Sequence, residues 1–159
     1  MAYVFAHGTG TEADPYLVET AEDLNGVRDY LDAHFKQTAD IDLSGYENWE
    51  PIGTSGTPFG GIYDGNGHEI TNLTITGEKK RAGLFREVED ATLKNIKLRN
   101  VDISLNYGGH GNCYGGGLAA LFYGSTAINC SITGNVSVNI SSEGEVFAGG
   151  IIGFSGDET

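Results

Sequence analysis

The chain has 159 residues, of which 39% are apolar, enough for one folded domain with a core of its own. Its 25 glycines come with only 3 prolines and follow no Gly-X-Y period, which excludes a collagen helix and proline-rich disorder. The formal net charge of −13 repels phosphate groups, so nucleic acid and anionic membrane surfaces are not expected partners.

The first ten residues, MAYVFAHGTG, carry neither the basic start nor the continuous apolar stretch of an export signal. No later segment reaches the roughly 18 consecutive apolar residues of a membrane-spanning helix. We therefore expect no membrane contact. The sequence is interpreted either as a segment excised from a longer protein or as a component of a lytic virus.

Residues 1–36 are predicted to form a short strand, at PYLVE, followed by a helix over residues 20–35. Thr20 has the position of an N-cap, and Asp23, three residues later, completes a capping-box pattern. Four apolar residues then recur at intervals of three and four along one face of this helix: Leu24, Val27, Leu31 and Phe35. An amphipathic helix of this kind needs a surface to cover.

Residues 37–159 are predicted to be β structure. Around Asp40 and Asp42 the sequence ADIDLSG alternates acidic and apolar residues with a period of two. A DGNG turn that begins at Asp64 then precedes a second alternating stretch. The division at residue 37 separates two parts of a single domain.

Two kinds of landmark repeat along this β region. Three similar hexapeptides each carry an asparagine, and these are Asn72, Asn95 and Asn129. Three segments place a glycine before apolar residues, and these glycines are Gly83, Gly117 and Gly150. The number of residues from Gly83 to Gly117 equals the number from Asn95 to Asn129. Gly83 therefore precedes Asn95 by the same interval as Gly117 precedes Asn129. The two landmarks therefore follow one period.

This periodicity predicts an all-β fold, a right-handed parallel β-helix (β-solenoid) with an N-terminal capping α-helix. A unit of two short strands and a glycine turn cannot bury its own apolar face, whereas stacked units form a continuous core. The helix is expected to cover the exposed end of the first coil. The repeated asparagines either stack their amides into a ladder or face solvent.

The last coil is incomplete after Gly150, because a further asparagine strand would begin beyond the end of the sequence. This predicts an open end of the solenoid. Its explanations are truncation, a capping partner, or a homo-oligomer that covers the end.

The segments Ala82–Phe85 and Gly116–Ala119 resemble the GLUG repeat of bacterial and phage surface proteins. The blocks GTGTEADPYLVETAEDL, QTADIDLSG, WEPIG and PFGGIYDGNGHEITNLTI fit the usual companion pattern, so the resemblance extends from Gly8 to about Phe154. It implies a β-helical architecture and a place in extracellular adhesins, wall-associated proteins or viral appendages, and it supplies no catalytic residues. Arg86 departs from the pattern, since many repeats have glycine there.

Acidic side chains in ordered segments are the candidates for metal binding and acid catalysis. Asp40 and Asp42 are candidate Ca²⁺ ligands on one strand face, with a solvated face as the alternative. Asp64 begins a weak calcium-loop pattern that a simple turn also explains. His110 and Cys113 have the spacing of half a zinc site. We predict no cofactor beyond the candidate Ca²⁺, and no enzymatic activity, because no catalytic motif occurs.

Aromatic residues are better candidates for binding, because their rings can stack on sugar faces while nearby amides bond to hydroxyl groups. The candidate glycan-binding residues are Tyr46, Trp49, Tyr107, Tyr114 and Tyr123. The alternative is that Trp49 and most of the tyrosines pack against the solenoid. Cys113 and Cys130 either pair or simply pack.

The combined interpretation is a non-enzymatic structural or adhesion module, located on a phage virion or a bacterial cell surface. Its expected partners are a glycan or neighbouring surface or virion proteins. The first alternative is a polysaccharide-degrading lyase or hydrolase of the same architecture, which would need a cleft of converging acids and a base. The second alternative is a scaffold that binds no ligand.

Overall fold

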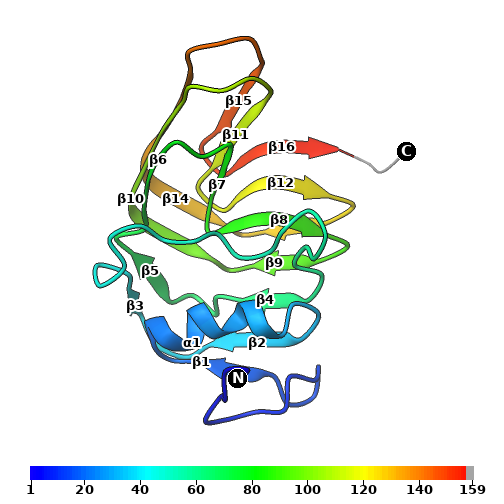
Figure 1. Cartoon of the computed structure of the whole chain (residues 1–159). Coiled ribbons are helices and arrows are strands. Elements are labelled where there is room, and N and C mark those ends of the chain that lie inside the picture. Colours follow the sequence, from blue (N-terminus) through cyan, green and yellow to red (C-terminus); the bar gives the residue numbers. More distant parts are fainter. Residues whose placement is uncertain (157–159) are drawn as a thin grey trace.

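The computed structural model describes residues 1–156, an all-β parallel solenoid of about 4 turns with one short helix near the N-terminus (Figure 1). The N-terminus lies at one end of the stack, and successive coils follow one above another toward the C-terminus. Each coil returns the chain to the same side one rung higher, so neighbouring strands run parallel. The predicted all-β parallel solenoid is therefore confirmed.

Four sheets run along the solenoid, and each gathers strands from successive coils. The first contains β1 (Tyr16–Val18), β2 (His34–Gln37), β4 (Ile62–Asp64), β9 (Thr92–Lys94) and β13 (Thr126–Ile128). The second contains β3 (Ile41–Asp42), β5 (Glu69–Thr71), β6 (Thr74–Gly77), β10 (Lys97–Tyr107) and β14 (Ser131–Ile140). The third contains β7 (Arg81–Ala82), β11 (Cys113–Gly116) and β15 (Val146–Gly149). The fourth contains β8 (Phe85–Glu89), β12 (Ala119–Tyr123) and β16 (Ile152–Gly156).

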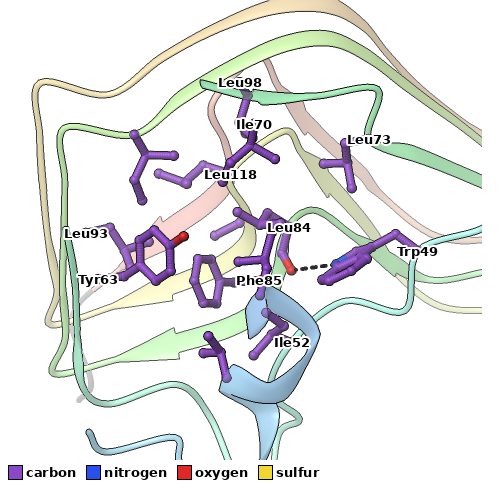
Figure 2. Close-up of a cluster of buried hydrophobic side chains, with 14 of the residues drawn as sticks. Trp49, Ile52, Tyr63, Ile70, Leu73, Leu84, Phe85, Leu93, Leu98 and Leu118 are labelled. Carbon is purple, nitrogen blue, oxygen red and sulfur yellow. Dashed lines mark hydrogen bonds between the residues drawn. The ribbon is translucent and has the colours of Figure 1, made fainter. Parts of the chain in front are cut away.

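Side chains at equivalent positions of successive strands stack into columns inside the coil. In the second sheet, strand pairing aligns one such column from Ile41 through Ile70 and Leu98 to Ile132. Figure 2 shows part of the resulting core, in which residues of several coils meet. Full burial of a Leu or Ile side chain stabilises a fold by about 1.5–3 kcal/mol. The core is therefore made by stacking of coils and not within any one coil.

Asparagines at the corners form side-chain ladders between coils. Asn95 and Asn129 turn the chain from the first sheet into the second with φ of 54° and 51°, a left-handed conformation that asparagine tolerates well. The Asn129 side-chain amide donates to Oδ1 of Asn95 at 3.0 Å, and that of Asn95 donates to Oδ1 of Asp64 at 2.9 Å. The ladder begins at the carboxylate of Asp64. A carboxylate only accepts hydrogen bonds, so no side-chain N–H group is left without a partner at this end of the ladder.

Asn72 belongs to a second ladder, at the bend between β5 and β6. Its side-chain amide donates to Oδ1 of Asp42 at 2.8 Å, and its own Oδ1 accepts from Asn100 at 2.7 Å. Asn72 and Asn95 are closer together in the sequence than Asn95 and Asn129 are, because Asn72 and Asn95 occupy two different corners of the coil. The partner of Asn72 in the following coil is Asn100.

Helix α1 (Ala21–Gly26) is much shorter than the helix predicted over residues 20–35. Its capping box is present: the Thr20 hydroxyl accepts from the Asp23 amide at 3.1 Å, and the Asp23 carboxylate accepts from the Thr20 amide at 3.0 Å. A 3-10 turn, η1 (Val27–Asp29), ends the helical region. Phe35 lies in β2, which pairs with β1 on one side and β4 on the other. The helical prediction is wrong there because sheet pairing outweighs the helical apolar pattern.

The helix lies between β1 and β2 in the chain, so it belongs to the first coil and is not placed beyond it. The outer edge of β1 is covered by the N-terminal segment. The Leu17 amide donates to the His7 carbonyl at 3.1 Å, and the Phe5 ring stacks on Tyr16 with 4.5 Å between ring centroids. The division predicted between residues 36 and 37 falls inside β2.

The C-terminal end of the described solenoid is open. Strands β13 to β16 form its outermost rung, and no described strand pairs with their outer edges. Three large apolar side chains are exposed there: Ile128 at 50%, Val146 at 40% and Ile151 at 36%. That a partner or a second copy covers this end stays a prediction.

Candidate functional site

Three connections between the second and third sheets stack into a protrusion, which we call the loop lobe, in the upper part of Figure 1. The loop lobe comprises residues 78–80, 108–112 and 141–145. Rung-to-rung hydrogen bonds order it: the Gly111 amide donates to the Glu143 carbonyl at 3.0 Å, and the Tyr114 amide donates to the Lys80 carbonyl at 2.7 Å. The loop lobe is thus a continuation of the solenoid's own bonding pattern.

A pocket of about 280 Å³ opens at the base of the loop lobe, and we call it the amide pocket. The amide of Asn139 donates to Oδ1 of Asn106 at 3.2 Å, a third asparagine ladder that holds both side chains in the wall. The side chains in this wall are mainly polar: Glu78, Asn106, Tyr107, Asn139 and Ser141. Tyr107, the residue after Asn106 in β10, is the aromatic residue among those that line the pocket.

A second pocket of about 230 Å³, the cationic pocket, lies beside the same lobe. It gathers four of the nine basic residues of the chain, which are Lys79, Lys80, Arg81 and Arg86, together with Glu50 and Pro51. The Lys80 ammonium lies 5.1 Å from the ring centroid of Tyr107, and the Arg81 guanidinium lies 5.9 Å from that of Tyr114. These cation–π contacts link the cationic pocket to the tyrosines of β10 and β11 that flank the loop lobe.

The structure brings only some of the candidate aromatic residues together. Tyr107 lies in the amide pocket, and Tyr114 stacks on Phe147 with 5.1 Å between ring centroids. Tyr123 lies further along, with its ring 6.2 Å from that of Phe154. Tyr46 is outside both pockets and packs edge-on against Trp49.

Trp49 lies in the core and is 0% exposed. Its indole Nε1 donates to the Leu84 carbonyl at 3.2 Å, the dashed contact in Figure 2. The ring of Tyr46 covers it at 5.1 Å between centroids. Trp49 presents no face to solvent, so its proposed role in glycan stacking is corrected to a role in the core.

The three candidate Ca²⁺ ligands take part in separate hydrogen-bond networks. Asp40 accepts from the Glu69 amide, and Asp42 and Asp64 each begin one of the asparagine ladders described above. Among residues 1–156, no three His, Cys, Asp or Glu side chains come together as a group that could hold a metal ion. The turn at Asp64 is explained without a metal, because its Oδ1 also accepts from the Asn66 amide at 2.8 Å.

Acidification is expected to weaken the ladder that begins at Asp42. Hydrogen bonds from Asn72, and then from Ser44, hold the pKa of Asp42 below its ordinary value of 3.8. A depressed folded-state pKa adds stability that is fully present above the unfolded pKa and is lost as pH falls through the folded pKa. We expect Asp42→Asn to be less stable than wild type near pH 6, with the difference shrinking below pH 4; urea unfolding across this range measures it. A difference that stays constant down to pH 2 contradicts this account.

The two cysteines are not joined. Cys113 is buried and Cys130 is half-buried, and both are free thiols. Burial raises the pKa of each thiol. His110 is exposed while Cys113 is buried, and no further ligand completes a metal site with them among the described residues.

Sequence reasoning missed the cationic pocket and the asparagines of the amide pocket. The sequence does contain an indication of the cationic pocket, because Lys79, Lys80 and Arg81 are consecutive in a chain with only nine basic residues. Arg86 stands out in the sequence only as a departure from a repeat pattern. Asn106 and Asn139 lie at equivalent positions of β10 and β14, which becomes visible only when the register is known.

No family model matches the chain. A protein of Evansella cellulosilytica, provisionally named a Gly-rich membrane protein, is 37% identical over 146 residues, covering 86% of this chain and 16% of that protein. Halomucin of Haloquadratum walsbyi is 32% identical over 148 residues, covering 83% of this chain and 2% of that protein. Within residues 1–156, neither helical segment has the length and apolar character needed to cross a membrane.

A solved structure from Bacteroides ovatus, provisionally named an immunoglobulin A1 protease, has a TM-score of 0.66 to this chain. The match covers 96% of this chain and 56% of that one at 24% identity, so it concerns the fold alone. Fold and comparisons together define a glycine-rich β-solenoid module. It is similar to short segments of much longer proteins, and the GLUG likeness remains a resemblance of sequence.

Proposed function

We propose that the chain is a non-enzymatic adhesion module of a cell-surface protein and that it binds glycans at its loop lobe. The amide pocket carries this proposal, because it is lined by Asn106, Asn139 and Ser141 together with Tyr107, at the end of β10 and β14. The ring supplies an apolar surface for a sugar face, while amides and hydroxyl groups bond to sugar hydroxyls. The stacked coils hold these groups in fixed positions, as binding sites require.

The names of the relatives support the cell-surface setting. One of them is provisionally named a membrane protein, and this chain spans 16% of its length. Neither of the two relatives is named as a virion component, so we propose a cellular surface and not a phage particle. We further propose that the coils are right-handed, the hand of about 98% of parallel crossover connections.

Replacing Tyr107 with alanine is expected to weaken glycan binding about fivefold to tenfold, because an aromatic anchor is lost from the amide pocket. The measurement is retention of the purified protein on an array of immobilised bacterial wall and capsule polysaccharides, followed by affinity determination for those retained. No metal is required by the proposal, so retention is expected to persist in EDTA.

Tyr46→Ala is the matched control, because it removes the same side chain from a position outside both pockets. Its retention is expected to equal that of wild type. Equal losses in the two variants would show that the loop lobe is not the binding surface. If no polysaccharide retains the wild-type protein, the glycan-binding proposal is wrong and a scaffold is favoured.

The enzymatic alternative has one supporting observation. A pocket of about 490 Å³ on another part of the molecule is lined by Asp32, Glu89 and Asp90, and a glycosidase needs paired carboxylates. No Lys, Arg or His is among the residues that line it, so the base of a lyase has no counterpart there. Released oligosaccharides in the retention assay, abolished by Asp32→Asn, would replace the adhesion proposal with a hydrolase.

A further inference from the structure

The cationic pocket stands apart from the charge of the rest of the chain. The formal net charge is −13, yet Lys79, Lys80, Arg81 and Arg86 meet around one cavity. Glu50 is the single acid in its lining, and it pairs with Lys79 at 3.3 Å. The other three cations have no carboxylate of a described residue within ion-pair distance. A cluster of like charges raises the energy of the unliganded protein, so its persistence points to an anion.

Arg81 adds an independent observation. Its Nε is buried and has no hydrogen-bond partner among the described residues. Buried donors in folded proteins are nearly always paired, so this guanidinium is incompletely bonded within the protein. The Tyr114 ring lies against this guanidinium at 5.9 Å and limits its movement. Because this Nε is closed to solvent, an acceptor in the cationic pocket would bond to the terminal nitrogens of the guanidinium, which is already held in place.

We infer that the cationic pocket binds the acid group of an anionic polysaccharide. The two guanidinium groups can donate paired hydrogen bonds to a carboxylate, sulfate or phosphate, which are the acid groups that sugars carry. A cavity of about 230 Å³ is smaller than pockets for whole small molecules, so it fits one acidic sugar unit of a longer chain. This inference rests on the proposed glycan binding and specifies its substrate class.

The Lys80 side chain connects a residue of each pocket. Lys80 lines the cationic pocket, and its ammonium lies over the ring of Tyr107, a residue that lines the amide pocket. A polysaccharide bound across both would place one sugar unit against the ring and hydrogen-bonding groups, and its acid group among the cations. Neutral and charged parts of one ligand would thus be recognised at adjacent positions.

The acidic surface elsewhere does not prevent this binding. At physiological salt, charges separated by more than about 8 Å are largely screened, so the charges lining the pocket decide local affinity. The remaining negative charge acts mainly at long range, where it slows the approach of an anionic chain at low salt. The affinity of the bound state is set by Arg81, Arg86 and Lys80.

The test compares affinities of wild type, Arg81→Gln, Arg86→Gln and Lys80→Gln for polygalacturonate, for heparin as a sulfated probe and for dextran as a neutral one. We expect at least one acidic polymer to bind more tightly than dextran. Each substitution should weaken that binding about tenfold without changing dextran binding, because a charge-assisted hydrogen bond is lost. Raising salt from about 0.05 M to about 0.5 M should weaken acidic binding in wild type.

Arg99→Gln is the matched control, since it removes one guanidinium that pairs with Glu69 outside the cationic pocket. Its affinities should equal those of wild type. Circular dichroism and thermal unfolding establish that each variant is folded, and Lys80 is exposed enough that its substitution leaves the core unaffected. Polysaccharides bound with no preference for acid groups, or variants that bind like wild type, overturn this inference and leave the proposed function standing. A protein that retains no polysaccharide overturns both.

Discussion

Replacing Gly83 with alanine is expected to lower the free energy of unfolding by about 3 kcal/mol, the upper part of the range for overpacked sites. An added Cβ would lie 2.5 Å from the Gly116 carbonyl oxygen and 3.1 Å from the Ala119 carbonyl carbon. Both are backbone atoms of the next coil, whose strands are paired on either side. Neither can move without distorting the rungs above. Urea unfolding followed by circular dichroism measures the change.

Gly150→Ala is the matched control, because Gly150 occupies the same landmark position in the last coil. The nearest atom to an added Cβ there is the Ile132 Cγ2 at 4.0 Å, so its stability should stay within about 0.5 kcal/mol of wild type. Gly117→Ala should fall between the two, since its closest contact is the movable end of the Ile132 side chain and its backbone contact, the Gly150 carbonyl oxygen at 2.8 Å, belongs to the outermost coil. Equal effects at Gly83 and Gly150 would show that close packing between coils is not what requires these glycines.

The solenoid fold could be predicted because the same physical requirement acts once per coil. A glycine is needed where the backbones of successive coils approach closely, and this requirement leaves a periodic trace at Gly83 and Gly117. The asparagines were harder to place because each coil has more than one corner at which a left-handed residue is favoured. Asn72 and Asn95 look alike in sequence since both turn the chain with positive φ, although they lie in different ladders.

The pockets could not be predicted for a different reason. They depend on loops of unequal length, which interrupt the repeat period, so the period of the sequence does not indicate where these loops meet. Lys80 and Tyr107 are distant in the sequence, and they meet only because β6 and β10 pair and carry their loops to the same corner. The apolar residue Phe35 shows the converse error, since a helical spacing is satisfied equally by a residue buried in a strand.

Replacing Trp49 with alanine is expected to lower the free energy of unfolding by about 3–5 kcal/mol, as for other large core side chains. The side chain is 0% exposed, and its removal leaves a cavity beside Leu84 and Tyr46. It also leaves the Leu84 carbonyl without its indole donor. For a domain of this size the melting temperature should fall by about 10 °C, which calorimetry measures.

Trp49→Phe separates the core role of this residue from a role in binding. Phenylalanine keeps most of the ring and loses the indole N–H, so its cost should be about 1–2 kcal/mol, that of one buried hydrogen bond. The variant should remain folded and should retain polysaccharides as wild type does, because Trp49 presents no surface to a ligand. A folded Trp49→Phe protein that loses retention, as Tyr107→Ala is expected to, would instead place the ring of Trp49 at the binding surface. The two variants together therefore test whether aromatic residues of this chain act by burial or by contact with sugar.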